Sequence, residues 1–186
     1  MANYGEELGY WYLRLNGFFP ITNFVFHSLS SETRKARYNA DADLLAIRPP
    51  NVSEVLMEET LKWDDKIISD HDQSKFVFVY CEVKTGEYDA SKLFAEERIQ
   101  YAKKRFGLSA DYSSVERVFK TILIANEEKP NNLNRFKFIS VDHIIEFIRS
   151  RFQDYDEVKY PSRMFFDSSL IQFLIHEARK KRRSRD

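Results

Sequence analysis

A glutamate and a lysine two residues apart close the most apolar stretch of the chain. Residues 76–84 read FVFVYCEVK, and this run of aromatic and β-branched residues predicts a β-strand. Because residues two apart in a strand point to the same face, Glu82 and Lys84 project together, while Val83 projects to the opposite side. The pattern places a carboxylate and an ammonium on one surface of a strand that we expect to be central in its sheet.

A second carboxylate precedes this pair in another expected strand. Asp43 lies in DADLLAIR, residues 41–48, and the two following prolines fix the end of that strand because proline cannot donate to a ladder. If the two strands pair antiparallel, the Asp43 carboxylate approaches that of Glu82. The repulsion between two such carboxylates is relieved by a hard cation, for which we expect Mg²⁺ or Mn²⁺. Such an ion activates water and polarises a phosphodiester, while a lysine stabilises the developing charge, so the chemistry is phosphodiester hydrolysis.

The Glu-x-Lys tripeptide occurs twice, and by itself it indicates little. The second copy, Glu157 to Lys159, lies in the polar segment QDYDEVKYP and follows no apolar run, so the strand context favours the first copy. In a purely structural alternative, Asp43, Glu82 and Lys84 form only a salt bridge on a solvated strand edge. Such a salt bridge contributes at most about 1 kcal/mol to the free energy of unfolding.

The surrounding elements predict an α/β fold with a central mixed β-sheet flanked by α-helices. Apolar residues at helical spacing indicate an insertion helix just after residue 50, followed by a polar turn at 69–74, and the polar residues 28–40 indicate an exposed loop. We expect strands over residues 23–27, 41–48, 76–84, 118–126 and 137–140. We expect further helices over residues 5–16, 92–107, 141–152 and 168–178, the second of them capped by Asp89 or Ser91.

Length, charge and cysteine content limit the class of protein. The chain has 186 residues, and we expect one domain over residues 1–178, with an insertion at about 50–75 and a basic tail at 179–186. With 29 basic and 29 acidic residues, any binding to nucleic acid must rely on local patches. A lone cysteine, Cys81, and the lack of a leader-like apolar run favour the cytoplasm, and no apolar stretch is long enough for a membrane span.

The chain resembles the PD-(D/E)xK nuclease superfamily over roughly residues 5–107. The resemblance rests on the order of four elements: a first helix with an acid, Asp43 in DADLLA, the motif CEVK, and a further helix. The order Glu6, Gly9, Leu13, Gly17 is similar to the first helix of many members. Glu6 would then be the helix acid, with its neighbour Glu7 as the rival and a stabilising interaction with the helix dipole as the alternative explanation.

The resemblance also implies roles for later residues. Asp43, followed by Leu-Leu-Ala, is similar to the aspartate of the family, and Asp41 on the same strand face is a backup ligand. Gln100, in the helix after the lysine strand, is similar to a glutamine found in some branches. On this basis Asp43, Glu82 and Glu6 would hold the metal, and Lys84 would position water or stabilise the transition state.

The resemblance implies a restriction-endonuclease-like core and a metal-dependent nuclease, with DNA expected as the substrate before RNA. A homodimer is expected if both strands of a duplex are cut, because two active sites are then needed. The alternative is a catalytically inactive module of the same fold that binds nucleic acid or a protein partner. The neutral net charge fits this alternative somewhat better.

Overall fold

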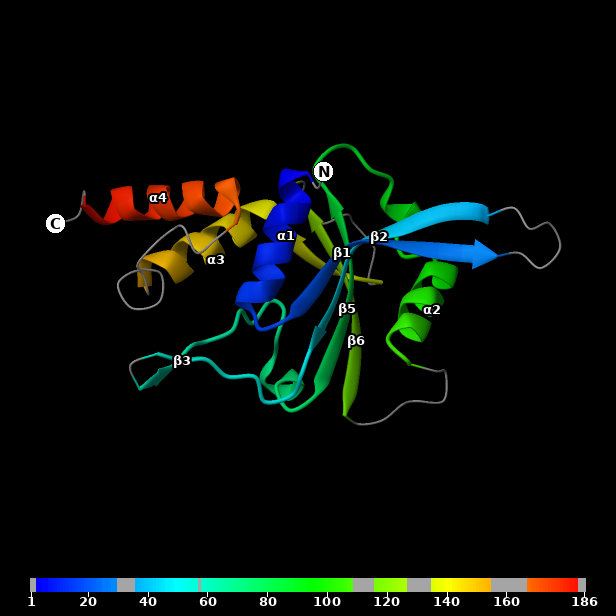
Figure 1. The fold of residues 1–186 in the computed structure, drawn as a ribbon, viewed down its shortest axis with the longest axis horizontal. Coiled ribbons are helices and arrows are strands. Elements are labelled where there is room, and N and C mark those ends of the chain that lie inside the picture. The colour runs from blue at the N-terminus through cyan, green and yellow to red at the C-terminus, as the bar shows by residue number, and fades with distance from the viewer. Residues whose placement is uncertain are drawn as a thin grey trace.

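A mixed five-stranded β-sheet forms the centre of the fold, and helices cover both of its faces (Figure 1). The computed structural model describes residues 3–29, 36–56, 58–108, 116–126, 135–154 and 167–183. Within these ranges the sheet is built from β1 (Phe19–Leu29), β2 (Ala36–Arg48), β5 (Phe76–Lys84), β6 (Arg117–Ala125) and β7 (Lys137–Ser140). The α-helices described are α1 (Tyr4–Leu15), α2 (Glu96–Arg105), α3 (Val141–Asp154) and α4 (Ser169–Arg183). The expected α/β class, with a mixed sheet flanked by helices, is confirmed.

The strand order is β1-β2-β5-β6-β7, which places β5 in the middle of the sheet. The β1–β2 and β2–β5 pairs are antiparallel, and the β5–β6 and β6–β7 pairs are parallel. The β2–β5 register runs from Arg48 opposite Val77 to Leu44 opposite Cys81, so these two strands pair antiparallel, which is the condition under which Asp43 approaches Glu82. As expected for a central strand, β5 is buried from Val77 to Val83.

Helix α1 begins and ends one residue earlier than the sequence predicts. The side chain of Asn3 accepts hydrogen bonds from the N–H groups of Gly5 and Glu6, which caps the first turn. Gly17 follows the last turn with φ +79°, a left-handed conformation that favours glycine. The helix then packs closely on the sheet, because a Cβ atom on Gly9 would lie 2.9 Å from Cδ1 of Leu44. The small residue therefore sets the distance between α1 and the strands that carry the expected site.

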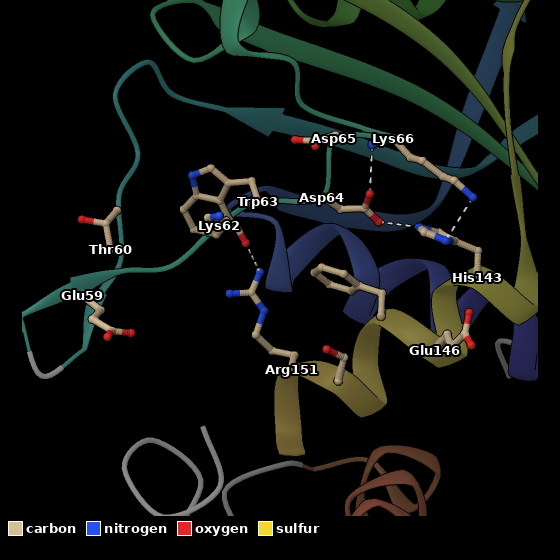
Figure 2. Close-up of a pocket in the computed structure, with 12 residues that line it drawn as sticks. Glu59, Thr60, Lys62, Trp63, Asp64, Asp65, Lys66, His143, Glu146 and Arg151 are labelled. Carbon is tan, nitrogen blue, oxygen red and sulfur yellow. Dashed lines mark hydrogen bonds and ion pairs between the residues drawn. The ribbon is translucent and has the colours of Figure 1, made fainter. Parts of the chain in front are cut away.

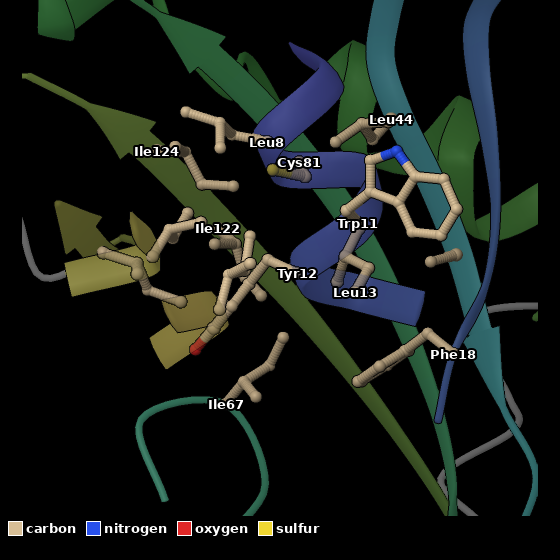
Figure 3. Packing of buried hydrophobic residues seen from close by; sticks show 14 of the residues in the cluster. Leu8, Trp11, Tyr12, Leu13, Phe18, Leu44, Ile67, Cys81, Ile122 and Ile124 are labelled. Carbon is tan, nitrogen blue, oxygen red and sulfur yellow. The ribbon is translucent and has the colours of Figure 1, made fainter. Parts of the chain in front are cut away.

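Two apolar clusters hold the helices against the two faces of the sheet. The larger cluster joins β2, β5 and β6 to α1, α3 and α4, and Figure 3 shows its centre. It includes Leu8, Tyr12, Leu44, Cys81, Ile122, Ile124, Ile144, Ile148, Ile171 and Ile175. The second cluster joins the opposite face to α2 and includes Phe26, Leu45, Tyr80, Phe94, Ala102 and Leu123. Helices α1 and α2 thus lie on opposite faces of the sheet.

The expected exposed loop over residues 28–40 is wrong at both of its ends. Strand β1 continues to Leu29, and β2 already begins at Ala36; the intervening residues 30–35 lie outside the described ranges. The β1–β2 hairpin extends past the end of the β2–β5 pairing and projects from the body of the sheet (Figure 1). The outer part of the β1–β2 hairpin is held by hydrogen bonds between the two backbones. The sequence prediction relied on an alternation of apolar and polar residues, which the polar segment 28–40 lacks, and so it missed these strand ends.

The helix expected within the insertion is also wrong. The short strands β3 (Val55–Leu56) and β4 (Glu59–Thr60) pair there instead, as Figure 2 shows in part. Asn51 and Glu58 have φ values of +56° and +74°, which interrupt any helix. The polar turn predicted at residues 69–74 is confirmed, since the 3₁₀ turn η1 (Asp70–Asp72) lies within it.

Two other helices differ from expectation at one end. Asp89 caps the 3₁₀ turn η2 (Ala90–Lys92), not an α-helix, and Phe94 has φ +54°, so α2 begins only at Glu96. Helix α4 continues to Arg183, so the first residues of the expected tail are helical, and residues 184–186 lie outside the described ranges. None of the helices in the described ranges is both long enough and apolar enough to cross a membrane.

The close approach of α1 to the sheet gives a stability prediction. Gly9→Val adds a branched side chain where Leu44 Cδ1 lies 2.9 Å and Ile124 Cδ1 3.0 Å from the position of a Cβ atom. We expect the free energy of unfolding to fall by about 1–3 kcal/mol, as for other overpacked cores. Gly86→Val is the matched control, because no atom lies within 4 Å of a Cβ atom built at Gly86. Urea denaturation tests this, and equal losses in the two variants would contradict it.

Candidate active site

The three side chains expected to form the site meet at the end of β5. Lys84 Nζ lies 2.8 Å from Asp43 Oδ2 and 2.8 Å from Glu82 Oε2. The Glu82 side chain is 4% exposed and that of Asp43 14%, whereas the Lys84 side chain is 28% exposed. One ammonium therefore bridges two carboxylates from neighbouring strands, with the ammonium on the more exposed side.

The register of the sheet brings Asp43 to this point. The last paired residues are Leu44 and Cys81, so Asp43, the residue before Leu44, comes beside the segment of β5 that follows Cys81. Beyond the last backbone pair, a side chain contacts β5 instead: Asp43 Oδ2 accepts a hydrogen bond from the Val83 N–H at 2.6 Å. The Asp43 carboxylate is therefore fixed by both the backbone of β5 and Lys84.

Two further residues, which the sequence interpretation missed, contact Glu82. The Tyr80 hydroxyl donates to Glu82 Oε1 at 2.6 Å, and Arg98 Nη1 lies 3.9 Å from the same oxygen. The pKa of Tyr80 is raised by burial and by the charge of Glu82, so the phenol remains protonated and donates. Two-residue spacing on β5 could have identified Tyr80. Arg98 could not be found in this way, because it lies on α2 and only the packing of that helix on the sheet brings it near Glu82.

The charge of Lys84 is stabilised by its partners. Burial on its own lowers the pKa of Lys84, but the hydrogen bonds to Asp43 and Glu82 outweigh it and leave that pKa above its usual value. Lys84 is thus a firmly held cation at neutral pH. It offsets one of the two carboxylate charges and leaves the trio with a net negative charge.

Glu6, the residue expected to be the helix acid, lies close enough to the trio to feel the charge of Asp43. Its pKa is raised by partial burial and then by the charge of Asp43, and Asn3 Nδ2 donates to its Oε1 at 2.7 Å. The rival, Glu7, accepts a hydrogen bond from the Ser168 hydroxyl and so connects α1 to the residue before α4. In the described ranges, however, no group of three or more His, Cys, Asp or Glu residues is arranged to hold a metal ion. A site here would thus rest on Asp43 and Glu82.

The remaining candidate residues are placed as follows. Gln100 donates through Nε2 to Glu96 Oε1 at 2.6 Å, so its side chain is engaged within α2 and not with the trio. The backup ligand Asp41 is exposed on β2. The second Glu-x-Lys copy, residues 157–159, lies outside the described ranges.

A second polar cluster lines a cavity of about 820 Å³ between the segment after β4 and helix α3 (Figure 2). Asp64 Oδ2 accepts from the Tyr12 hydroxyl at 2.8 Å and lies 2.6 Å from His143 Nε2. Because Asp64 can only accept when ionised, Nε2 carries the hydrogen, and His143 Nδ1 accepts from Lys66 Nζ at 3.1 Å. The sequence interpretation missed this cluster, because its members are far apart in the chain and only the fold assembles them.

We nevertheless place the candidate active site at the trio. The residues lining the cavity do not include Asp43, Glu82 or Lys84. Within the cavity, Asp64 is already paired with His143, and Arg151 donates to the Lys62 carbonyl at 2.7 Å. The carboxylate of Asp64 is thus paired with a histidine within the cavity, whereas the trio brings two carboxylates to one ammonium.

Comparison with known proteins adds no relationship to this geometry. No protein-family model matches the chain, and neither a curated protein nor a solved structure matches it.

The cavity cluster predicts a pH-dependent contribution to stability. Burial alone raises the pKa of Asp64, but hydrogen bonds from Lys66, His143 and Tyr12 hold it below its usual value. A depressed carboxyl pKa stabilises the fold above the unfolded value of about 4, and this stabilisation is lost as the pH falls through the folded pKa. We expect Asp64→Asn to be less stable than the wild type at pH 7 and the difference to shrink towards pH 3. Urea denaturation at several pH values measures this, and a constant difference would contradict it.

Proposed function

We propose that the chain is a metal-dependent nuclease that hydrolyses phosphodiester bonds, with DNA as the preferred substrate. The observation that carries this proposal is the convergence of Asp43, Glu82 and Lys84 at the end of the central strand, with both carboxylates within 2.8 Å of one ammonium. The preference for DNA rests on the resemblance of the motifs to PD-(D/E)xK nucleases.

We further propose that the fold is a restriction-endonuclease-like core. Three features support this: β2 and β5 pair antiparallel, β5 and β6 pair parallel, and the expected acidic helix lies on one face of the sheet with α2 on the other. The acid, aspartate and Glu-x-Lys elements then occur in the order and on the elements that the resemblance implies.

The donor set suits a hard divalent cation. Mg²⁺ is usually held by one or two carboxylates, with water and substrate phosphates completing its shell, so a protein group of three acids is not required. Asp43 and Glu82 would hold the ion, and Glu6 lies close enough for its pKa to be influenced by the charge of Asp43. When bound, the ion would supply Lewis-acid stabilisation of the phosphate and a more acidic water.

The residues of the chain have separate roles in this proposal. Tyr80 and the Val83 N–H orient the two carboxylates by donating to Glu82 and Asp43 respectively. Lys84 keeps its proton, so its ammonium stabilises negative charge that develops on the phosphate during attack. Because Lys84 is hydrogen-bonded to both carboxylates, it must give up at least part of this contact when a divalent cation binds.

The alternative is a module of the same fold that binds nucleic acid or a protein without turnover. One observation favours it: Lys84 already satisfies both carboxylates as a closed ion-pair network. In that case the trio stabilises the sheet, and no divalent cation is needed.

Cleavage assays with two variants test the nuclease proposal directly. Glu82→Gln removes a carboxylate, and Lys84→Met removes the ammonium while retaining much of the side-chain volume. We expect each to lower Mn²⁺-dependent cleavage of plasmid and single-stranded DNA by at least about 100-fold, the effect of losing a group that stabilises the transition state. Asp70→Asn, an exposed carboxylate before the start of β5, is the control and retains activity. Full cleavage by both variants, or wild-type cleavage in EDTA, would refute the proposal.

Metal binding can be tested without relying on activity. In Lys84→Met the two carboxylates repel each other without compensation, so the variant should have a lower Tm than the wild type in EDTA. Because the ammonium no longer competes, we expect Mn²⁺ to raise the Tm of Lys84→Met more than that of the wild type. Adding Glu82→Gln to the variant should remove this gain. A Tm that does not respond to Mn²⁺ in any of these proteins would exclude the metal site.

A further inference from the structure

Arg98 brings a second cation to the candidate site from helix α2. Ala102 lies one turn further along the same helix and is fully buried against the sheet, so the face of α2 that carries Arg98 is directed towards the strands. Arg98 Nη1 lies 3.9 Å from Glu82 Oε1. The guanidinium thus approaches the site from the face of the sheet opposite α1.

Arg98 is not required to satisfy Glu82. Glu82 Oε1 already accepts from Tyr80 at 2.6 Å, and Oε2 lies 2.8 Å from Lys84 Nζ. The 3.9 Å separation from Arg98 exceeds hydrogen-bonding distance, and the Arg98 side chain is 38% exposed. Arg98 therefore stands, partly open to solvent, beside a carboxylate whose two oxygens each already have a short contact with another group, and it also interacts with the Tyr80 hydroxyl.

A polyanionic substrate needs a cation such as Arg98 near the candidate site, because the site itself is rich in carboxylates. Asp43, Glu82 and the neighbouring Glu6 repel phosphates, and Lys84 is already held by two carboxylates. The chain has equal numbers of acidic and basic residues, so its net charge gives no general attraction to a polyanion. A guanidinium presents a planar set of donors that matches a phosphate, and unlike Lys84 it is not fixed by short ion pairs.

We propose that Arg98 binds a phosphate group of the nucleic-acid substrate, on the α2 side of the candidate active site. This inference rests on the proposed nuclease function, since it assigns the substrate contact of that same site. It makes Arg98 a residue of substrate binding, distinct from Lys84 and from the two carboxylates.

The test compares Arg98→Gln and Arg98→Lys with the wild type. Binding of a short fluorescent DNA is measured by anisotropy over a series of salt concentrations, with Ca²⁺ in place of Mn²⁺ to limit cleavage. We expect Arg98→Gln to bind about tenfold more weakly, as for loss of a charged hydrogen bond, and its slope of log affinity against log salt to fall by about one. Arg98→Lys keeps the charge but loses the planar donor set, so it should retain the salt slope and bind with intermediate affinity.

A matched control is Arg14→Ala, which removes the same type of residue from an exposed position near the far end of α1, where its guanidinium stacks on Trp11. It should bind DNA as the wild type does. In Mn²⁺, cleavage by Arg98→Gln should show a higher KM with a smaller change in kcat, and unchanged thermal unfolding would separate substrate binding from a purely structural role.

The outcomes distinguish this inference from the function on which it rests. If the wild type cleaves DNA but Arg98→Gln binds and cleaves as Arg14→Ala does, the nuclease proposal stands and the role of Arg98 is overturned. If the wild type binds DNA without cleaving it and Arg98→Gln weakens that binding, the role of Arg98 stands and the nuclease proposal fails. If the wild type neither binds nor cleaves, both are overturned.

Discussion

The ion-pair network of Lys84 with Asp43 and Glu82 is the interaction on which the candidate site depends. Removing two carboxylates and an ammonium from water is costly, and the cost is offset only when each charge finds partners at short distance. Here Tyr80 and the backbone N–H of Val83 supply the additional hydrogen bonds. Because these groups belong to two paired strands, any shift of the β2–β5 register would separate them. The position of the site is thus a property of the sheet and not of a flexible loop.

The rest of the fold keeps that register in place from both faces. Helix α1 approaches the sheet through Gly9, and α2 packs on the other face through Ala102. The antiparallel hairpin β1–β2 supports one side of β5, while the parallel strands β6 and β7 support the other. One face of the central strand is therefore apolar, and the other becomes polar only towards its last residues. This change of character confines the charged groups to one end of the sheet.

The sequence predicted the parts governed by local pattern. The apolar run of β5, Gly17 after α1 and the prolines after β2 defined those elements, and two-residue spacing put Glu82 and Lys84 on one face. It failed where single backbone conformations decide the structure. Left-handed residues such as Glu58 and Phe94 produced a hairpin and a 3₁₀ turn in place of helix. Arg98 and the Asp64–His143 pair could not be foreseen, since their partners are brought close only by long-range packing.

The lone cysteine lies next to this network in the sequence but faces the opposite layer. Cys81 is fully buried among the apolar side chains under α1, and burial, together with the charges of Asp43 and Glu82, raises the pKa of its thiol well above the usual value. A protonated, enclosed thiol does not react with alkylating reagents while the fold is closed. Since the chain contains no other cysteine, its rate of alkylation reports how often the centre of the molecule opens to solvent.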